Sequence, residues 1–86
     1  MSNEERRAEP RVRSRGPVNL LVERAGSVAG TIYDVSISGI SVDAEAGLPA
    51  GSMVRIEGEG FLGEGVVQHC SECGGRYRIG VALTPL

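Results

Sequence analysis

The segment 34–39, with the sequence DVSISG, combines a carboxylate, two hydroxyls and a glycine within six positions. Short polar side chains of this kind either bond their own backbone in a turn or point at a ligand. Gly39 permits a positive φ or a close approach to the main chain. Two interpretations follow: a turn that ends a strand, with Asp34 accepting from backbone N–H groups, or a platform where Asp34 and Ser36 meet the edge of a nucleobase.

The other residues suited to binding chemistry are arginines near the N-terminus. Five arginines fall in the first fifteen positions: Arg6, Arg7, Arg11, Arg13 and Arg15. They contain two overlapping Arg-x-x-x-Arg spacings, which suit a phosphate-bearing ligand or the O6 and N7 acceptors of guanine. A guanidinium plane also stacks on a purine face. The alternative is a solvated tail, because glutamates are interspersed among these arginines.

The composition limits the class of protein. The 86 residues are enough for one domain. A net charge of −2 argues against a general nucleic-acid binder, so no DNA partner is expected. The chain has neither an apolar run of about 18 residues nor the apolar core of a signal peptide, which predicts no membrane insertion and a cytoplasmic location.

The elements that must position these residues are strands. Alternating apolar runs separated by turn residues recur about every 8–12 residues, with no helical period. The predicted strands are 18–23, 28–35, 40–43, 53–57, 61–68 and 76–83, and 69–75 is predicted as a hairpin connection. This pattern predicts an all-β fold, a small antiparallel barrel, since closure removes exposed strand edges. Residues 17–86 are assigned to the barrel and residues 1–16 to a flexible arginine-rich arm.

Cys70 and Cys73 form a Cys-x-x-Cys sequence beside His69. Zinc requires four ligands, and redox motifs of this type normally begin a helix, so incidental cysteines in a hairpin are the favoured interpretation. A redox-sensitive pair or a metal shared in a dimer remains an alternative. With one histidine and no nucleophile paired to a base, the chain is not expected to be an enzyme. Neither a metal nor a cofactor is predicted.

Taken together, the two polar motifs resemble the signature of the PilZ domain family. That signature is an Arg-x-x-x-Arg arm followed, after a strand hairpin, by Asp/Asn-x-Ser-x-x-Gly. Here it corresponds to Arg7 and Arg11, then Asp34, Ser36 and Gly39. The sequence LPAGSMV at 48–54 and the paired segments 65–67 and 76–81 are also similar to the family, so the resemblance covers about residues 5–83.

The resemblance implies a receptor for cyclic di-GMP, built on a PilZ-like split β-barrel of six or seven antiparallel strands. The ligand-binding residues that it implies are Arg6, Arg7, Arg11, Asp34, Ser36 and Gly39. The arginines would hold phosphate and guanine, with Arg6 assisting, and the other three would line the guanine site. Binding is expected to order the arm, and this ordering would relay the signal to an unidentified downstream protein.

Many family members carry a C-terminal helix that packs on the barrel, and it is not seen here. An uncovered barrel mouth would favour a homodimer or docking onto another protein, and both are further expectations. Two alternatives to the receptor remain open. One is an adaptor with the same barrel and little or no nucleotide affinity. The other is a redox or metal-responsive protein acting through Cys70 and Cys73.

Overall fold

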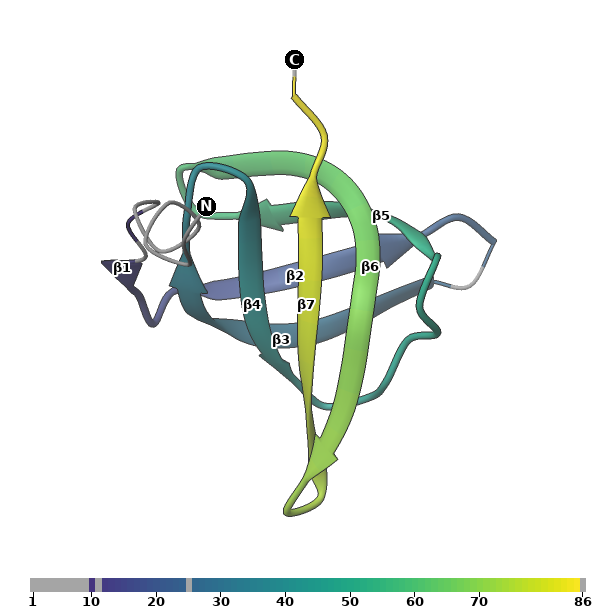
Figure 1. The fold of residues 1–86 in the computed structure, drawn as a ribbon. Coiled ribbons are helices and arrows are strands. Elements are labelled where there is room, and N and C mark those ends of the chain that lie inside the picture. Colours follow the sequence, from purple (N-terminus) through teal and green to yellow (C-terminus); the bar gives the residue numbers. More distant parts are fainter. Residues whose placement is uncertain (1–9, 11, 25, 86) are drawn as a thin grey trace, which may run out of the picture.

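The computed structural model describes residues 10, 12–24 and 26–85, which form seven antiparallel strands (Figure 1). The strands are β1 (Val12–Arg13), β2 (Pro17–Val22), β3 (Gly26–Val35), β4 (Gly39–Ala44), β5 (Met53–Gly58), β6 (Phe61–Cys73) and β7 (Arg76–Leu83). Among these residues, no helix has the length and apolar character required to cross a bilayer.

The sheet closes on itself. Its strand order is β1-β3-β2-β5-β6-β7-β4, and an additional pairing joins the last strand of this order, β4, to the second, β3. Strands β2 to β7 therefore form a six-stranded antiparallel barrel, and β1 is an extra strand on β3. The all-β antiparallel barrel predicted from the sequence is confirmed.

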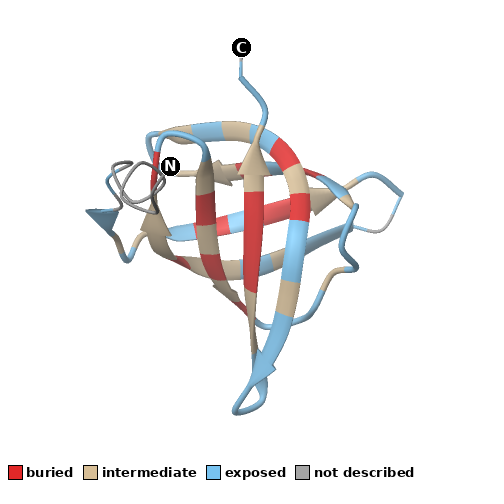
Figure 2. Cartoon of the chain, in the orientation of Figure 1, coloured by how far each residue is buried: buried red, intermediate tan, exposed pale blue. Residues whose placement is uncertain are grey.

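The core fills the barrel with aliphatic side chains from alternate positions of the strands (Figure 2). In β4, for example, Ile40, Val42 and Ala44 are buried, while Ser41 and Asp43 between them are only partly buried. Because successive side chains of a strand point to opposite faces, Ser41 and Asp43 lie on the outer face of the barrel. The alternation of apolar and polar residues that predicted the strands thus also determines which side chains lie on the outer surface of the barrel.

Strand β6 is longer than predicted, because residues 69–75 are not a hairpin connection. The strand continues to Cys73 and pairs with β7 down to Arg76, and only Gly74 and Gly75 form the turn. Both glycines have positive φ, 61° and 83°, as a two-residue type I′ turn requires. The prediction failed because residues 71–76 are exposed at a hairpin that projects from the barrel (Figure 1). With both faces in water, this part of the strand has no apolar alternation to detect.

Strand β1 lies within the stretch assigned to the flexible arm. Val12 pairs with Val35 and Arg13 with Asp34 on β3, and the Ser14 N–H donates to the Tyr33 carbonyl at 3.2 Å. The end of the assigned arm is therefore a short strand on the barrel. The division of the chain at residue 16 into arm and barrel stays a prediction.

Candidate ligand-binding site

The polar motif at 34–39 ends β3 and begins β4. Between these strands, the Ser36 N–H donates to the Gly39 carbonyl at 2.8 Å, and the Ser36 hydroxyl approaches the same oxygen at 3.4 Å. Ser36 is buried, and the Ser38 carbonyl accepts from the Leu83 N–H of β7 at 2.8 Å. The segment is thus a turn that is tied to its own backbone and to the neighbouring strand. A turn and a ligand platform, the two interpretations made from the sequence, are compatible. The hydrogen bonds hold the turn in a fixed position, as a platform requires.

Gly39 is not among the residues with positive φ. A Cβ at this position would lie 3.2 Å from the Val81 carbonyl oxygen of β7. The sequence predicted a close approach to the main chain at Gly39, and in the structure β7 makes this approach. The missing side chain allows β4 to begin directly against β7.

Asp34 stands in a polar row that crosses five strands. Each residue of the row is the cross-strand partner of the next. The row consists of Arg13 (β1), Asp34 (β3), Ser41 (β4), Gly80 (β7) and His69 (β6). Directly opposed residues of antiparallel strands share a face of the sheet. Since Ser41 faces outward, the row lies on the outer surface of the barrel, beside the 36–39 turn.

A groove of about 220 Å³ lies along this row. Its lining includes Ser38, Gly39, Ser41, Gln68, His69 and Gly80. A Cβ at position 80 would collide with the imidazole of His69, so the glycine allows this ring to lie against the β7 backbone. The groove therefore has small residues as its floor, the motif turn at one side and an imidazole at the other.

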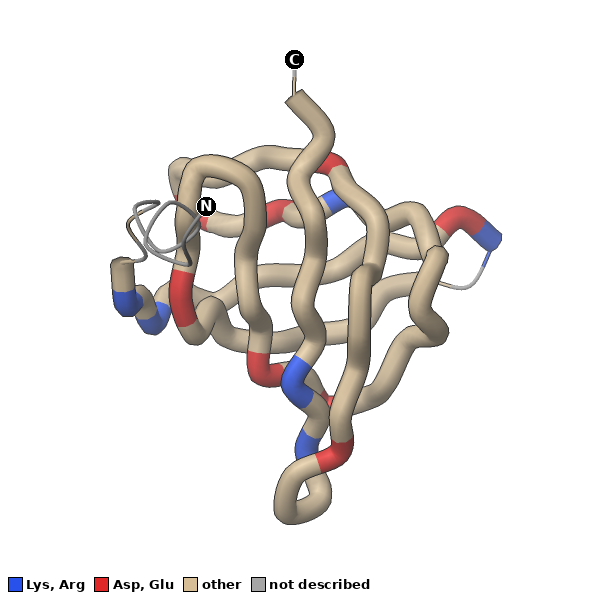
Figure 3. The backbone as a smooth tube through the Cα atoms, in the orientation of Figure 1, with Lys and Arg blue, Asp and Glu red and all other residues tan. Residues whose placement is uncertain are grey.

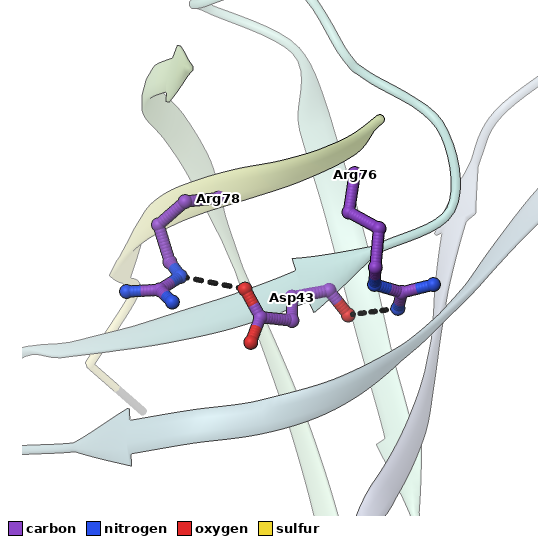
Figure 4. Close-up of polar contacts among 3 residues, drawn as sticks. All are labelled: Asp43, Arg76 and Arg78. Carbon is purple, nitrogen blue, oxygen red and sulfur yellow. Dashed lines mark hydrogen bonds and ion pairs between the residues drawn. The ribbon is translucent and has the colours of Figure 1, made fainter. Parts of the chain in front are cut away.

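On the adjoining part of the outer surface, the Tyr33 ring lies between arginines. The guanidinium carbons of Arg13 and Arg78 are 4.1 Å and 3.6 Å from the ring centroid. Arg78 Nε donates to Asp43 Oδ1 at 2.7 Å, and Arg76 donates to the Asp43 carbonyl at 3.3 Å (Figure 4). The hydrogen bond to Asp43 is the main cause that raises the pKa of Arg78, so this guanidinium stays charged.

The basic residues near the Tyr33 ring come from two separate parts of the chain. Arg13 and Arg15 lie at the N-terminal end of the described barrel, and Arg76 and Arg78 lie on β7 near its hairpin (Figure 3). Arg13, Arg15, Tyr33 and Asp43 line a second hollow of about 520 Å³. Arginines thus lie near both ends of the surface between Asp34 and Asp43, although the chain as a whole is acidic.

Three of the six predicted binding residues are described, and the structure brings them together. Asp34, Ser36 and Gly39 lie at the junction of β3 and β4. Arg6, Arg7 and Arg11 lie outside the described residues. The roles of all six in binding stay predictions.

Sequence reasoning singled out Arg13 only as one of the five N-terminal arginines and His69 only as the neighbour of Cys70. It did not single out the remaining residues of this surface: Tyr33, Ser41, Asp43, Gly80 and Arg78. The alternation around Ser41 could have placed it outside, next to the motif. The others depend on strand register, because their neighbours come from different parts of the chain.

Cys70 and Cys73 are free thiols on the same strand. Residues three apart in a strand lie about 10 Å apart and face opposite sides of the sheet. A disulfide requires Cα atoms within about 7 Å, so the two thiols cannot bridge within the chain without breaking β6. The described residues also contain no group of three or more His, Cys, Asp and Glu side chains that could hold a metal ion.

The model of the PilZ domain matches residues 5–86, nearly the whole chain and both polar motifs. Among curated proteins, none matches the chain.

Proposed function

Because the chain belongs to the PilZ domain family, whose members generally bind cyclic di-GMP and are typically non-catalytic receptor domains, we propose that this protein is a cyclic di-GMP receptor. The observation that carries the proposal is the position of Asp34. It lies on the outer face between Arg13 and Ser41, beside the motif turn and its groove. The resemblance and the geometry therefore indicate the same surface.

The chemistry of the ligand suits these groups. Guanine offers N–H donors at one edge and the O6 and N7 acceptors at another. A carboxylate such as Asp34 complements the donors, and arginine forks complement the acceptors and the two phosphates. In this proposal Arg7 and Arg11 hold phosphate and guanine, Arg6 assists them, and Ser36 and Gly39 keep the turn in place.

The proposed mechanism is that binding orders the arm over the barrel. Ordering a segment on binding lowers affinity but creates a surface that exists only in the bound state. A downstream protein, or a second copy of this chain, would recognise that surface. No chemical step on the ligand is required.

The decisive experiment is calorimetric titration of the purified protein with cyclic di-GMP and, separately, with GTP. We expect heat of binding with the cyclic dinucleotide and none with GTP. Asp34→Asn should weaken binding by ~1.5–3 kcal/mol, the range for hydrogen bonds to charged groups. Glu23→Gln is the matched control, because Glu23 is exposed in the β2–β3 turn and this variant should bind like the parent.

An adaptor that acts through protein contacts is the second candidate. It is favoured by the aliphatic side chains of Ile37 and Leu62, which are 85% and 71% exposed, and Ile37 belongs to the motif turn itself. Absence of heat with cyclic di-GMP at high concentration would reject the receptor and favour this adaptor.

A further inference from the structure

The Tyr33 ring is enclosed by two cations. The guanidinium carbons of Arg13 and Arg78 are 4.1 Å and 3.6 Å from the ring centroid. Arg13 comes from β1 on one side of β3, and Arg78 comes from β7, beyond β4 on the other side, so the two cations approach the ring from opposite sides. Tyr33 is also the residue at which the β3–β4 register shifts, between Ile32 and Asp34. Such a bulge redirects a side chain, here onto the outer surface between β1 and β7.

One side of this stack is fixed in the barrel wall. Arg78 of β7 pairs with Asp43 of β4 across the ladder, and its Nε donates to the carboxylate at 2.7 Å. Asp43 therefore compensates the charge of Arg78. As a result, Tyr33 can accept a second cation on its other face with less repulsion between the two guanidiniums.

The other side of the stack belongs to β1. This strand has only two residues, Val12 is 65% exposed, and Arg13 makes no ion pair among the described residues. Besides the ladder itself, β1 is held by the Ser14 N–H bond to the Tyr33 carbonyl and by the Arg13 contact with the Tyr33 ring. Both contacts are made to the same residue of β3.

We propose that Tyr33 is a positioning residue that clamps β1 to the barrel and thereby sets where the arginine arm joins the ligand platform. Arg13 lies opposite Asp34, and Arg11 precedes Val12 in the sequence. Holding β1 therefore fixes the end of the arm beside Asp34 before the ligand arrives, which reduces the ordering required on binding. The effect on binding rests on the proposed function, whereas the clamp itself does not.

The test compares Tyr33→Leu with Tyr33→Phe. Leucine removes the aromatic face, and phenylalanine keeps it while removing the hydroxyl. Two measurements are made on each full-length variant: amide hydrogen exchange at Ser14 without ligand, and calorimetric affinity for cyclic di-GMP. Arg13→Gln removes the same contact without changing β3, and serves if Tyr33→Leu does not fold.

We expect Ser14 exchange to be about two- to fivefold faster in Tyr33→Leu and Arg13→Gln, the factor that corresponds to one exposed cation–π contact. Affinity should fall by a similar factor, and exchange at Ile40 in the core should not change. Tyr33→Phe, which loses the hydroxyl contact with Arg78 but keeps the ring against Arg13, should match the parent in Ser14 exchange.

Unchanged Ser14 exchange in both disrupting variants would reject the clamp. Faster exchange with unchanged affinity would reject its role in positioning the arm. If the parent protein binds no cyclic di-GMP, the proposed function fails and the positioning role fails with it, while Ser14 exchange still decides whether the clamp exists.

Discussion

At the scale of single residues, the candidate site depends on where Asp34 sits rather than on any unusual property of its carboxylate. It is flanked across the ladder by Arg13 and Ser41, and it follows Tyr33 at the bulge. Its neighbours therefore come from three different strands. A substitution at one of them is expected to alter the surface without unfolding the barrel, because the core lies on the opposite face of the sheet.

The imidazole of His69 and the glycine beneath it should be energetically coupled. Alone, Gly80→Ala should cost about 1 kcal/mol, because the new Cβ displaces the ring from the β7 backbone. In a His69→Ala background the same change should cost nothing, or stabilise by about 0.5 kcal/mol, since glycine within a strand is itself unfavourable. Urea unfolding of the parent, both single variants and the double variant measures the difference. Additive effects would show that the ring does not rest on Gly80.

The residues of the site that could be predicted are those contained in one short segment. Asp34, Ser36 and Gly39 are adjacent in the sequence, so their pattern is visible without knowing the fold. Arg78 and Asp43 are 35 positions apart, and only the β4–β7 register brings them into contact. Such pairs carry no local signal.

At the scale of strands, the sequence predicted six of the seven, and the reason is the alternation of buried and exposed positions. In β5, Val54 and Ile56 are buried between exposed or partly buried neighbours, as the pattern requires. Strand β1 has only Val12 and Arg13, too short a run to show any period. The end of β6 escaped prediction for a different reason, since neither of its faces is covered.

The extension of β6 through Cys70 and Cys73 gives a prediction about oxidation. Under a mild oxidant the monomer should keep both thiols, because strand geometry separates them. Any disulfide should join two chains through the exposed Cys73, so Cys73→Ser should prevent covalent dimers and Cys70→Ser should not. Intact mass after alkylation, together with non-reducing electrophoresis, distinguishes these species. An internal disulfide in folded monomer would reinstate the redox alternative.

At the scale of the whole molecule, closure of the sheet could be predicted from size, since an open sheet this small leaves sticky edges. Which strands pair with one another in the closed sheet could not be predicted in this way. Strand β4 pairs with β3, which precedes it directly in the sequence, and also with β7, where Gly39 meets Ala82 and Ala44 meets Tyr77. Several strand orders satisfy the same alternation, so pairing depends on how the complete core packs.

Ligand binding should be visible in the stability of this closed barrel. A ligand that binds only the folded state at one hundred times its Kd adds about 2.7 kcal/mol to the free energy of unfolding. For a domain of this size the thermal midpoint should then rise by about 10–20 °C. Calorimetric scans with cyclic di-GMP measure the shift, and GTP at the same concentration should produce none. An equal shift with both nucleotides would contradict a specific guanine-dinucleotide site.

The enclosure of Tyr33 also has a spectroscopic consequence. The chain has no tryptophan and only two tyrosines, so Tyr33 and Tyr77 are the sources of its tyrosine emission. Tyr77 lies on β7 against Gly47, whereas Tyr33 is stacked between guanidiniums beside Asp34. A Tyr77→Phe protein would therefore have a single tyrosine fluorophore, located where the first strand meets the barrel. Its emission would follow the attachment of that strand in real time, with no added label.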